Sequence, residues 1–194
     1  MLEAGLWEGA RGGRRIIIDG SSSCVGKSTL AKAVASAIGA TFLDMDDLCW
    51  IPGWRRRAPA HERAVVEEAT RCESWVCGGI YGTGEDIVYA RADTVVILNH
   101  VGRGRVISRM VRRTLHRALS GEPCCGGNHE TLWSRLRYTW SSGVPRRYDK
   151  TRRQTRMGQV RYSAPQAKIV WLDSQAEVDA FMKGLRCVGV HCET

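Results

Sequence analysis

Short apolar runs alternate along the chain with longer stretches in which apolar residues recur at helical spacing. The apolar runs predict five strands, over residues 15–19, 41–43, 75–77, 94–98 and 168–172. The helical spacing predicts helices over residues 26–38, 61–71, 101–119 and 131–141, and a last one that opens at a Ser-x-x-Glu capping box, Ser174 to Glu177. Strands that alternate with helices form parallel sheets covered on both faces. The pattern therefore predicts an α/β chain, a three-layer αβα fold around a parallel five-stranded sheet.

We predict a single domain over residues 14–194, preceded by a flexible lead-in over residues 1–13. A chain of 194 residues with 43% hydrophobic content is long enough for one well-buried core. The lead-in is rich in glycine and mixed in charge, and it precedes the first apolar run. In the basic helix at 101–119, an apolar stripe is formed by Val106, Met110, Val111 and Leu115.

Residues 16–30 read IIIDGSSSCVGKSTL, a strand followed by a Gly/Ser-rich loop and a helix. This setting is typical of a P-loop, where backbone amides and the positive end of the helix dipole hold phosphate groups. We therefore predict that the chain binds a nucleoside triphosphate, with Lys27 on the terminal phosphates and the Ser28 hydroxyl on Mg²⁺. The predicted cofactor-binding residues are Gly20, Ser21, Ser22, Ser23, Cys24, Val25, Gly26, Lys27, Ser28 and Thr29.

The loop departs from the usual spacing at its first residue. The pattern G-x4-G-K-[ST] has its first glycine where this chain has Ser21, and Gly20 stands one place earlier. Two alternatives stay open: Ser21 occupies the turn at some conformational cost, or the loop is one residue longer.

Three carboxylates, Asp44, Asp46 and Asp47, follow the predicted second strand. Phosphoryl transfer needs a metal ligand and a group that orients the acceptor, and the carboxyl ends of parallel strands are where α/β sites form. Continued alternation along an extended chain places Asp44 and Asp46 on one side and Asp47 on the other. We predict that one carboxylate holds a metal-bound water and the next orients the acceptor hydroxyl. The alternative is that these acids only cap the following turn.

The positive charge of the chain is concentrated in one region. Residues 101–162 hold fourteen arginines and one lysine against three acidic residues, a balance of +12 within a chain of net charge +9. This imbalance predicts a polyanionic partner, either the polyphosphate of a nucleotide or a nucleic-acid backbone. Arginine suits bidentate phosphate contact, and the candidates are Arg109, Arg112, Arg113, Arg117, Arg146, Arg147, Arg152, Arg153 and Arg156.

The sequence also indicates the cellular setting. No apolar run approaches the roughly 20 residues that span a bilayer, and residues 1–15 contain no apolar segment of a signal peptide. The eight cysteines include no C-x-x-C pair, so reduced thiols are a better interpretation than disulfides. We expect a cytoplasmic protein without a membrane partner.

Several stretches carry a resemblance to a known family: LDMDDLCWIPGW at 43–54, WVCGGIY at 75–81, RADTVVIL at 91–98, LWSRLRYTW at 132–140 and PRR at 145–147. Together they resemble the adenylate-kinase-like P-loop proteins known as DNA topology modulation proteins, over about residues 15–182. The resemblance implies a P-loop NTPase of the nucleoside- or nucleotide-kinase type, with ATP and Mg²⁺ as ligands. It also implies a mobile, helical, Arg-rich lid within roughly residues 103–160.

The chain departs from that family at two acids. The family has one acid at the end of the third strand, where this chain has Gly78, and one after the fourth, where it has Asn99. A Walker B metal ligand is therefore missing at both positions. Without a substitute, the resemblance implies a chain that binds ATP and turns it over poorly.

Shikimate-kinase-like enzymes offer such a substitute. They carry Asp-x-Asp after the second strand and a glycine-rich end to the third, and this chain resembles them in the DMD at 44–46 and the GG at 78–79. The likeness implies that Asp44 is the outer metal ligand and that Asp46 or Asp47 is the acceptor-side carboxylate.

The leading prediction is an ATP-dependent phosphotransferase for a nucleoside, nucleotide or similar metabolite. Its predicted catalytic residues are Lys27, Asp46, Asp47, Arg109, Arg113, Arg146 and Arg147, with Ser28 and Asp44 as metal ligands. The alternative is a nucleic-acid-associated regulatory P-loop ATPase that binds a DNA backbone through residues 101–162. Charge does not separate the two, because both partners are polyanions.

Overall fold

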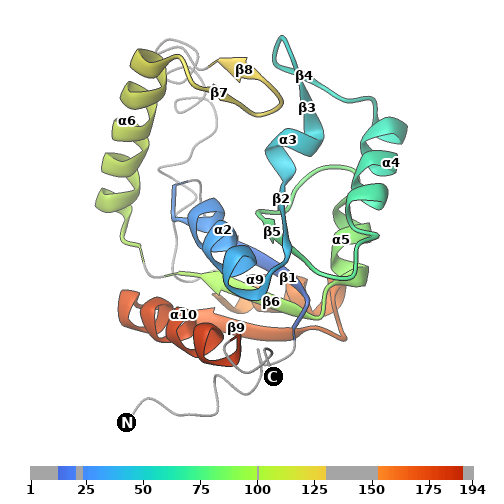
Figure 1. Ribbon diagram of the computed structural model, residues 1–194, viewed down its shortest axis with the longest axis vertical. Helices are drawn as coiled ribbons and strands as arrows, with labels where there is room; N and C mark the ends of the chain where they lie inside the picture. Colours follow the sequence, from blue (N-terminus) through green and yellow to red (C-terminus); the bar gives the residue numbers. More distant parts are fainter. Residues whose placement is uncertain (1–12, 21–23, 100, 130–152, 190–194) are drawn as a thin grey trace.

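The central sheet has five parallel strands in the spatial order β2–β5–β1–β6–β9 (Figure 1). Each strand coincides with one of the predicted apolar runs: β1 (Arg15–Gly20), β2 (Thr41–Asp44), β5 (Trp75–Gly78), β6 (Thr94–Leu98) and β9 (Lys168–Leu172). Gly78 is paired with Ile18 of β1 on one side and with Asp44 of β2 on the other. The carboxyl ends of β1, β5 and β2 therefore lie next to one another at one edge of the sheet.

This computed structural model describes residues 13–20, 24–99, 101–129 and 153–189. Residues 1–12 of the predicted lead-in lie outside the described residues, and so does the predicted helix at 131–141. The single domain at 14–194 and the lid bounds of 103–160 stay predictions. In the part of the chain that is described, no helix combines the length and the apolar character needed to cross a bilayer.

The described residues form seven helices: α2 (Lys27–Ile38), α3 (Met45–Cys49), α4 (Pro59–Ala69), α5 (Glu85–Arg91), α6 (Arg103–Ser120), α9 (Arg153–Ser163) and α10 (Gln175–Gly189). Helices α2, α4, α6 and α10 lie where the sequence predicted them, and most of their ends differ from the predicted ends by no more than about two residues. The predicted capping box of α10 is confirmed: the Glu177 amide donates to the Ser174 hydroxyl at 3.1 Å, and the Ser174 amide donates to the Glu177 carboxylate at 3.2 Å.

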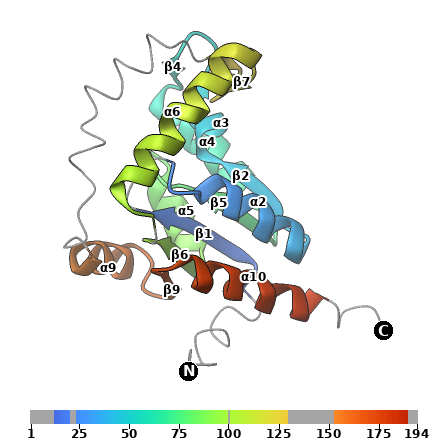
Figure 2. The same ribbon diagram turned by 90° about the vertical axis from the view of Figure 1, so that its left-hand side faces the viewer.

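The helices cover both faces of the sheet, which gives the predicted three layers (Figures 1 and 2). Because side chains alternate along a strand, β1 contributes Ile16 and Ile18 to one core and Ile17 to the other. The first core also contains Phe181 of α10 and buried residues of α2, and the second contains Val66 of α4 and buried residues of α5 and α9. The αβα fold is therefore confirmed.

Residues 45–49 form the short helix α3, so β2 does not continue as an extended tip. The Asp44 side chain accepts the Asp46 amide at 3.0 Å, which makes Asp44 the N-cap of α3. The predicted alternation of Asp44, Asp46 and Asp47 required extended backbone and is wrong. Because successive helical residues are turned by about 100°, the carboxylates of Asp46 and Asp47 point in different directions around α3.

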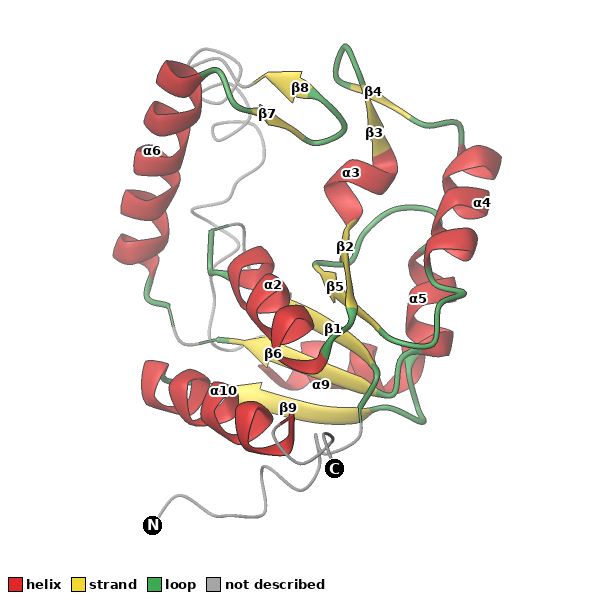
Figure 3. Cartoon of the chain, viewed as in Figure 1, coloured by secondary structure: helices red, strands yellow, loops and turns green. Residues whose placement is uncertain are grey.

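Helix α6 stands apart from the sheet, and two small hairpins meet beyond its far end (Figures 2 and 3). The hairpins are formed by β3 (Trp50–Ile51) with β4 (Arg55–Arg56), and by β7 (Pro123–Cys124) with β8 (Asn128–His129). The Trp54 amide donates to Asn128 Oδ1 at 2.6 Å, and Asn128 Nδ2 donates to the Ile51 carbonyl at 3.0 Å. Helix α6 is therefore joined to the body at both ends, through β6 and through the hairpin junction.

The apolar stripe predicted on α6 divides between two surfaces. Val106 and Met110 are buried, and Thr114 continues that inner face at the same spacing. Val111 and Leu115 are 51% and 45% exposed. The inner face follows i, i+4 and i+8, so Val111 and Leu115, each one position further along, are turned out of it.

Candidate functional site

The β1–α2 connection has the backbone of an anion-binding loop in its described part. Strand β1 ends at Gly20 and α2 begins at Lys27, with Gly26 as its N-cap at φ 107° and no side-chain cap. Cys24 also has positive φ, at 61°. Gly26 has no side chain with which to cap the first amides of α2, which lie at the positive end of the helix dipole. Residues 21–23 lie outside the described residues, so the alternatives for Ser21 stay open.

Gly20 has no room for a side chain. A Cβ built on it would lie 2.9 Å from Val25 Cγ2 and 3.0 Å from the Leu98 carbonyl oxygen. The preceding residue, Asp19, is 3% exposed and accepts the Gly20 amide at 2.7 Å. The glycine one place ahead of the usual position is therefore needed to let the chain leave β1 between two neighbours.

Lys27 extends toward the end of β5, since its Cε lies 3.4 Å from the position that a Cβ would take on Gly79. The neighbouring Gly78 is held closely against α2. A Cβ on Gly78 would lie 3.3 Å from the Ala31 Cβ and 3.4 Å from the Ser28 Cα. The close approach of α2 to β5 accounts for glycine where the resembling family has an acid.

Asp44 is placed beside that glycine by the β2–β5 register. Burial raises the pKa of Asp44, and the nearby carboxylates of Asp46 and Asp47 add to the effect, although the hydrogen bond from the Asp46 amide opposes it. The alternative interpretation, in which the acids cap the next turn, therefore holds for Asp44 as one of its roles. One carboxylate oxygen caps α3, which leaves the other for a further contact.

Asp46 faces the end of β5 from α3. Its Oδ1 accepts a hydrogen bond from the Tyr81 hydroxyl. Burial raises the pKa of Tyr81, and the charge of Asp46 raises it further, so the phenol stays protonated as a donor. The structure thus places Asp46 near the carboxyl ends of the strands, with the Tyr81 hydroxyl donating to one of its oxygens.

Asp47 points away from Asp46 and contacts the β7–β8 hairpin. Its Oδ1 accepts the Gly126 amide at 2.9 Å. Gly126 packs against Trp50, and a Cβ on it would overlap the Trp50 carbonyl oxygen. Asp47, predicted as a second acceptor-side carboxylate, thus lies at the junction between α3 and the hairpin.

Two of the four predicted catalytic arginines, Arg109 and Arg113, lie on α6. Arg109 reaches the β1–α2 connection, with its Nη1 3.9 Å from the position of a Cβ on Gly26. Arg113 is half-buried, and its Nε is buried without a hydrogen-bond partner among the described residues. Arg146 and Arg147 lie outside the described residues. The structure therefore brings Arg109 to the amino end of α2 from a segment about 80 residues further along the chain.

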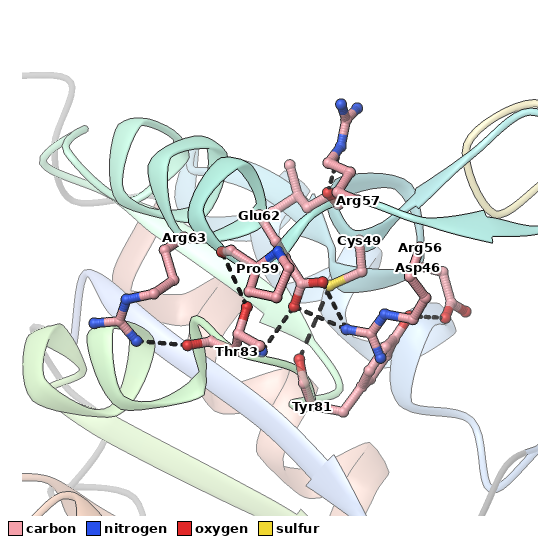
Figure 4. A network of polar contacts seen from close by, with 10 residues as sticks. Asp46, Cys49, Arg56, Arg57, Pro59, Glu62, Arg63, Tyr81 and Thr83 are labelled. Atoms are coloured by element: carbon pink, nitrogen blue, oxygen red, sulfur yellow. Dashed lines mark hydrogen bonds and ion pairs between the residues drawn. The ribbon is translucent and has the colours of Figure 1, made fainter.

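Sequence reasoning missed an ion pair beside Asp46, shown in Figure 4. Arg56 of β4 donates through Nη2 to both Glu62 carboxylate oxygens, at 2.8 and 2.7 Å, and the Thr83 amide donates to Glu62 at 2.7 Å. The Glu62 side chain is 1% exposed. Burial opposes its ionisation, yet the hydrogen bonds from Arg56 and Thr83 outweigh burial and hold the pKa of Glu62 below its ordinary value. The available signal was weak, because Arg56 stands among three consecutive arginines.

The cysteine nearest this pair stays a thiol. Burial, with the charge of Glu62 close by, raises the pKa of Cys49 to about 12. The described cysteines are all free, namely Cys24, Cys49, Cys72, Cys77, Cys124 and Cys125.

Replacing Glu62 by glutamine is expected to lower the free energy of unfolding at neutral pH by about 2–3 kcal/mol, because Arg56 loses its buried counter-charge. A lowered pKa contributes stability above the unfolded value of 4.5, and that stability is lost as pH falls through the folded pKa. The natural chain should therefore lose stability below about pH 4.5, and Glu62→Gln should lose less there, in urea titrations at several pH values. Glu67→Gln on the same helix is the control, because Glu67 is exposed. Equal pH slopes in the natural chain and Glu62→Gln would contradict the assignment.

Replacing Gly126 by alanine is expected to open the hairpin junction. Gly126 and Gly127 both have positive φ, 71° and 85°, but nothing lies within 4 Å of a Cβ on Gly127. Gly127→Ala should cost about 1 kcal/mol of stability from its φ alone, and Gly126→Ala about 1–3 kcal/mol more from the overlap with Trp50. Urea denaturation of the two variants measures the difference. Equal losses would mean that the hairpin does not pack against Trp50.

Comparisons with known proteins give a fold and no family. No protein-family model matches the chain, and no curated protein matches it. The resemblance to DNA topology modulation proteins therefore stays a prediction.

Solved structures do match. The chain is similar to a gluconokinase from Sinorhizobium meliloti 1021, with 17% identity over 91% of each chain and a TM-score of 0.47. It is also similar to a shikimate kinase from Acinetobacter baumannii in complex with shikimate, with 15% identity over 97% of this chain and 99% of that chain and a TM-score of 0.53. At this identity the second likeness carries the fold alone. The chain therefore has the P-loop kinase fold, with five parallel strands between layers of helices.

Proposed function

We propose that this chain is an ATP-dependent phosphotransferase that acts on a small molecule. The observation that carries the proposal is the amino end of α2, where the N-cap is a glycine, Lys27 is the first helical residue and Arg109 of α6 lies close to Gly26. Amides at a helix end, an ammonium group and a guanidinium group are donors that together suit a polyphosphate. Asp46 lies near the same edge of the sheet and supplies a carboxylate for an acceptor.

Each residue has a distinct part in this proposal. Lys27 and the amides of α2 hold the phosphates. Ser28 and the Asp44 oxygen that does not cap α3 hold Mg²⁺, which usually takes only one or two protein ligands. When bound, ATP with Mg²⁺ supplies the phosphoryl group and offsets its charge. Asp46 accepts the proton of the acceptor hydroxyl. Arg109 and Arg113 lower the energy of the charge that develops during transfer.

Asp47, which the sequence predicted as an acceptor-side carboxylate, has a different part in this proposal. It holds the Gly126 amide of the β7–β8 hairpin, which continues from α6. Through this contact, Asp47 keeps α6 and its arginines in position over the loop. We therefore assign it a positioning part, and Asp46 the part next to the acceptor.

ATP consumption tests the proposal. ADP release is followed with the natural chain and Mg²⁺, across nucleosides, nucleotides, polyols and hydroxy acids, with duplex DNA as a parallel additive. Stimulation by a small molecule, with one phosphoryl group recovered on it per ADP, supports the phosphotransferase. Stimulation by DNA and by no small molecule would overturn it in favour of the nucleic-acid alternative.

A further inference from the structure

The guanidinium of Arg56 lies against two aromatic rings beside the acceptor carboxylate. Its Cζ is 5.7 Å from the centre of the Trp50 ring and 5.4 Å from the centre of the Tyr81 ring. These distances are within the range of cation–π contacts. The Trp50 ring comes from β3 and the Tyr81 ring from the loop after β5. The tertiary fold therefore brings the two rings together around Arg56, and their spacing in the sequence does not predict it.

Glu62 fixes the orientation of this stacked guanidinium. Both Glu62 oxygens accept from one nitrogen, Nη2, and Glu62 is itself buried and held by the Thr83 amide. Among the described residues, Nε and Nη1 of Arg56 have no hydrogen-bond partner, and the side chain is 40% exposed. Arg56 is therefore rigid on one side and offers N–H donors on the other.

Tyr81 links this cation to the acceptor carboxylate. Its hydroxyl donates to Asp46, while its ring lies beside Arg56 (Figure 4). A carboxylate that accepts from a hydroxyl group and a guanidinium that donates to an anion are thus held around a single side chain. The Asp46 carboxylate and the Arg56 guanidinium can therefore bind two groups of one ligand, a hydroxyl and an anion, at a separation that the protein sets.

We propose that the acceptor is a small non-aromatic alcohol that carries an anionic group, a carboxylate or a phosphate. Its hydroxyl meets Asp46 and its anionic group meets the free N–H donors of Arg56. This inference rests on the proposed phosphotransferase function and names the substrate class for the same site.

The same stack discriminates against nucleosides. A base that entered between Trp50 and Tyr81 would displace Arg56 from both rings and from Glu62. That displacement would leave a buried carboxylate without its counter-charge, which costs several kcal/mol. The faces of Trp50 and Tyr81 that Arg56 covers are therefore used to hold an arginine, and those faces are not free to stack on a base.

Matched acceptor pairs test the inference. ADP release and KM are measured with aldonic acids against their neutral aldonamides, with sugar phosphates against the parent sugars, and with adenosine and cytidine. For the natural chain we expect the KM of the best anionic acceptor to be at least about tenfold below that of its neutral partner. Comparing the acid arm with the phosphate arm identifies the anionic group. The nucleosides should give no ADP above the rate without acceptor.

A double variant separates recognition from folding. Arg56→Gln with Glu62→Gln removes both charges together and leaves no buried ion unpaired. It should abolish the preference for the anionic partner while the KM for ATP stays unchanged. Arg55→Gln, on the same strand and exposed, is the control and should keep the preference.

Failure of this inference is distinguishable from failure of the proposed function. If ATP binds but a nucleoside is the best acceptor, or acid and amide have equal KM, the substrate class is wrong and the kinase stands. Retention of the preference in the double variant likewise overturns the part assigned to Arg56. Absence of ATP binding in calorimetry overturns the proposed function and this inference with it.

Discussion

Replacing Lys27 by alanine should abolish measurable ATP turnover. Lys27 is the first residue of α2, and its side chain extends toward Gly79, on the proposed phosphate side of the helix amino end that Arg109 also approaches. Removing one preorganised donor from developing charge typically costs about 10²–10³-fold in rate. ADP release in the presence of the best acceptor measures the loss. Unchanged turnover would rule out the part assigned to the loop.

Lys32 provides the matched control for this experiment. It lies on the same helix, is exposed, and has its Nζ 5.3 Å from the centre of the Phe42 ring. Lys32→Ala removes one positive charge from α2 without touching its amino end. We expect its ATP turnover to fall far less than that of Lys27→Ala, because Lys32 is exposed and acts on the site only through its charge, which lowers the pKa of Asp44. An equal loss in both variants would indicate an effect of charge on the whole helix.

The second large effect is expected for Asp46→Asn. Loss of the carboxylate removes the group that accepts the proton from the acceptor hydroxyl, a contribution of about 10²–10⁴-fold. Asparagine keeps the size of the side chain and a carbonyl oxygen for the Tyr81 hydroxyl. Phosphoryl transfer should therefore fall, while the Kd for ATP in calorimetry changes little. Parallel loss of transfer and of ATP binding would place Asp46 on the nucleotide and not on the acceptor.

Two further variants sharpen this prediction. Tyr81→Phe keeps the ring beside Arg56 and removes the hydroxyl that donates to Asp46 and is also hydrogen-bonded to Trp50. Because the Asp46 carboxylate itself stays, this variant should lower transfer less than Asp46→Asn does. Asp86→Asn removes an exposed carboxylate that pairs with Arg63 on the outer surface. It should leave transfer unchanged. A larger effect from Asp86→Asn than from Tyr81→Phe would mean that overall charge, and not contact, governs the rate.

The sheet was predictable because each strand contains a short apolar run, continuous through β6 and shortest in β2. Strands β5 and β6 are buried on both faces, so apolar residues occupy consecutive positions and do not recur at helical spacing. Asn99 marks the end of β6, and Gly78 with Gly79 marks the end of β5. The short elements were not predicted, for the opposite reason. The two-residue strands and the short helix α3 contain too few residues for any periodicity, and their conformation depends on a cap at Asp44 and on contacts across the hairpin junction.

The site divides in the same way. The β1–α2 connection is local: the end of β1 and the amino end of α2 lie within about fifteen consecutive residues, so their order in the chain brings them together. Arg56, Glu62 and Tyr81 are separated by up to 25 residues and meet only because α4 and the end of β5 pack against the β3–β4 hairpin. Nothing in their spacing distinguishes them from other arginines, glutamates and tyrosines.

The order of residues by itself thus determined the α/β fold with its parallel sheet, since hydrophobic period and turn composition act over a few neighbours. The contacts of Asp46 and Asp47 were decided in three dimensions, because helix α3 turns one toward Tyr81 and the other toward Gly126. The surroundings of Arg56 and Glu62 were decided there as well. An ion pair becomes rigid only when burial removes water from one partner, and burial is a property of the packed chain.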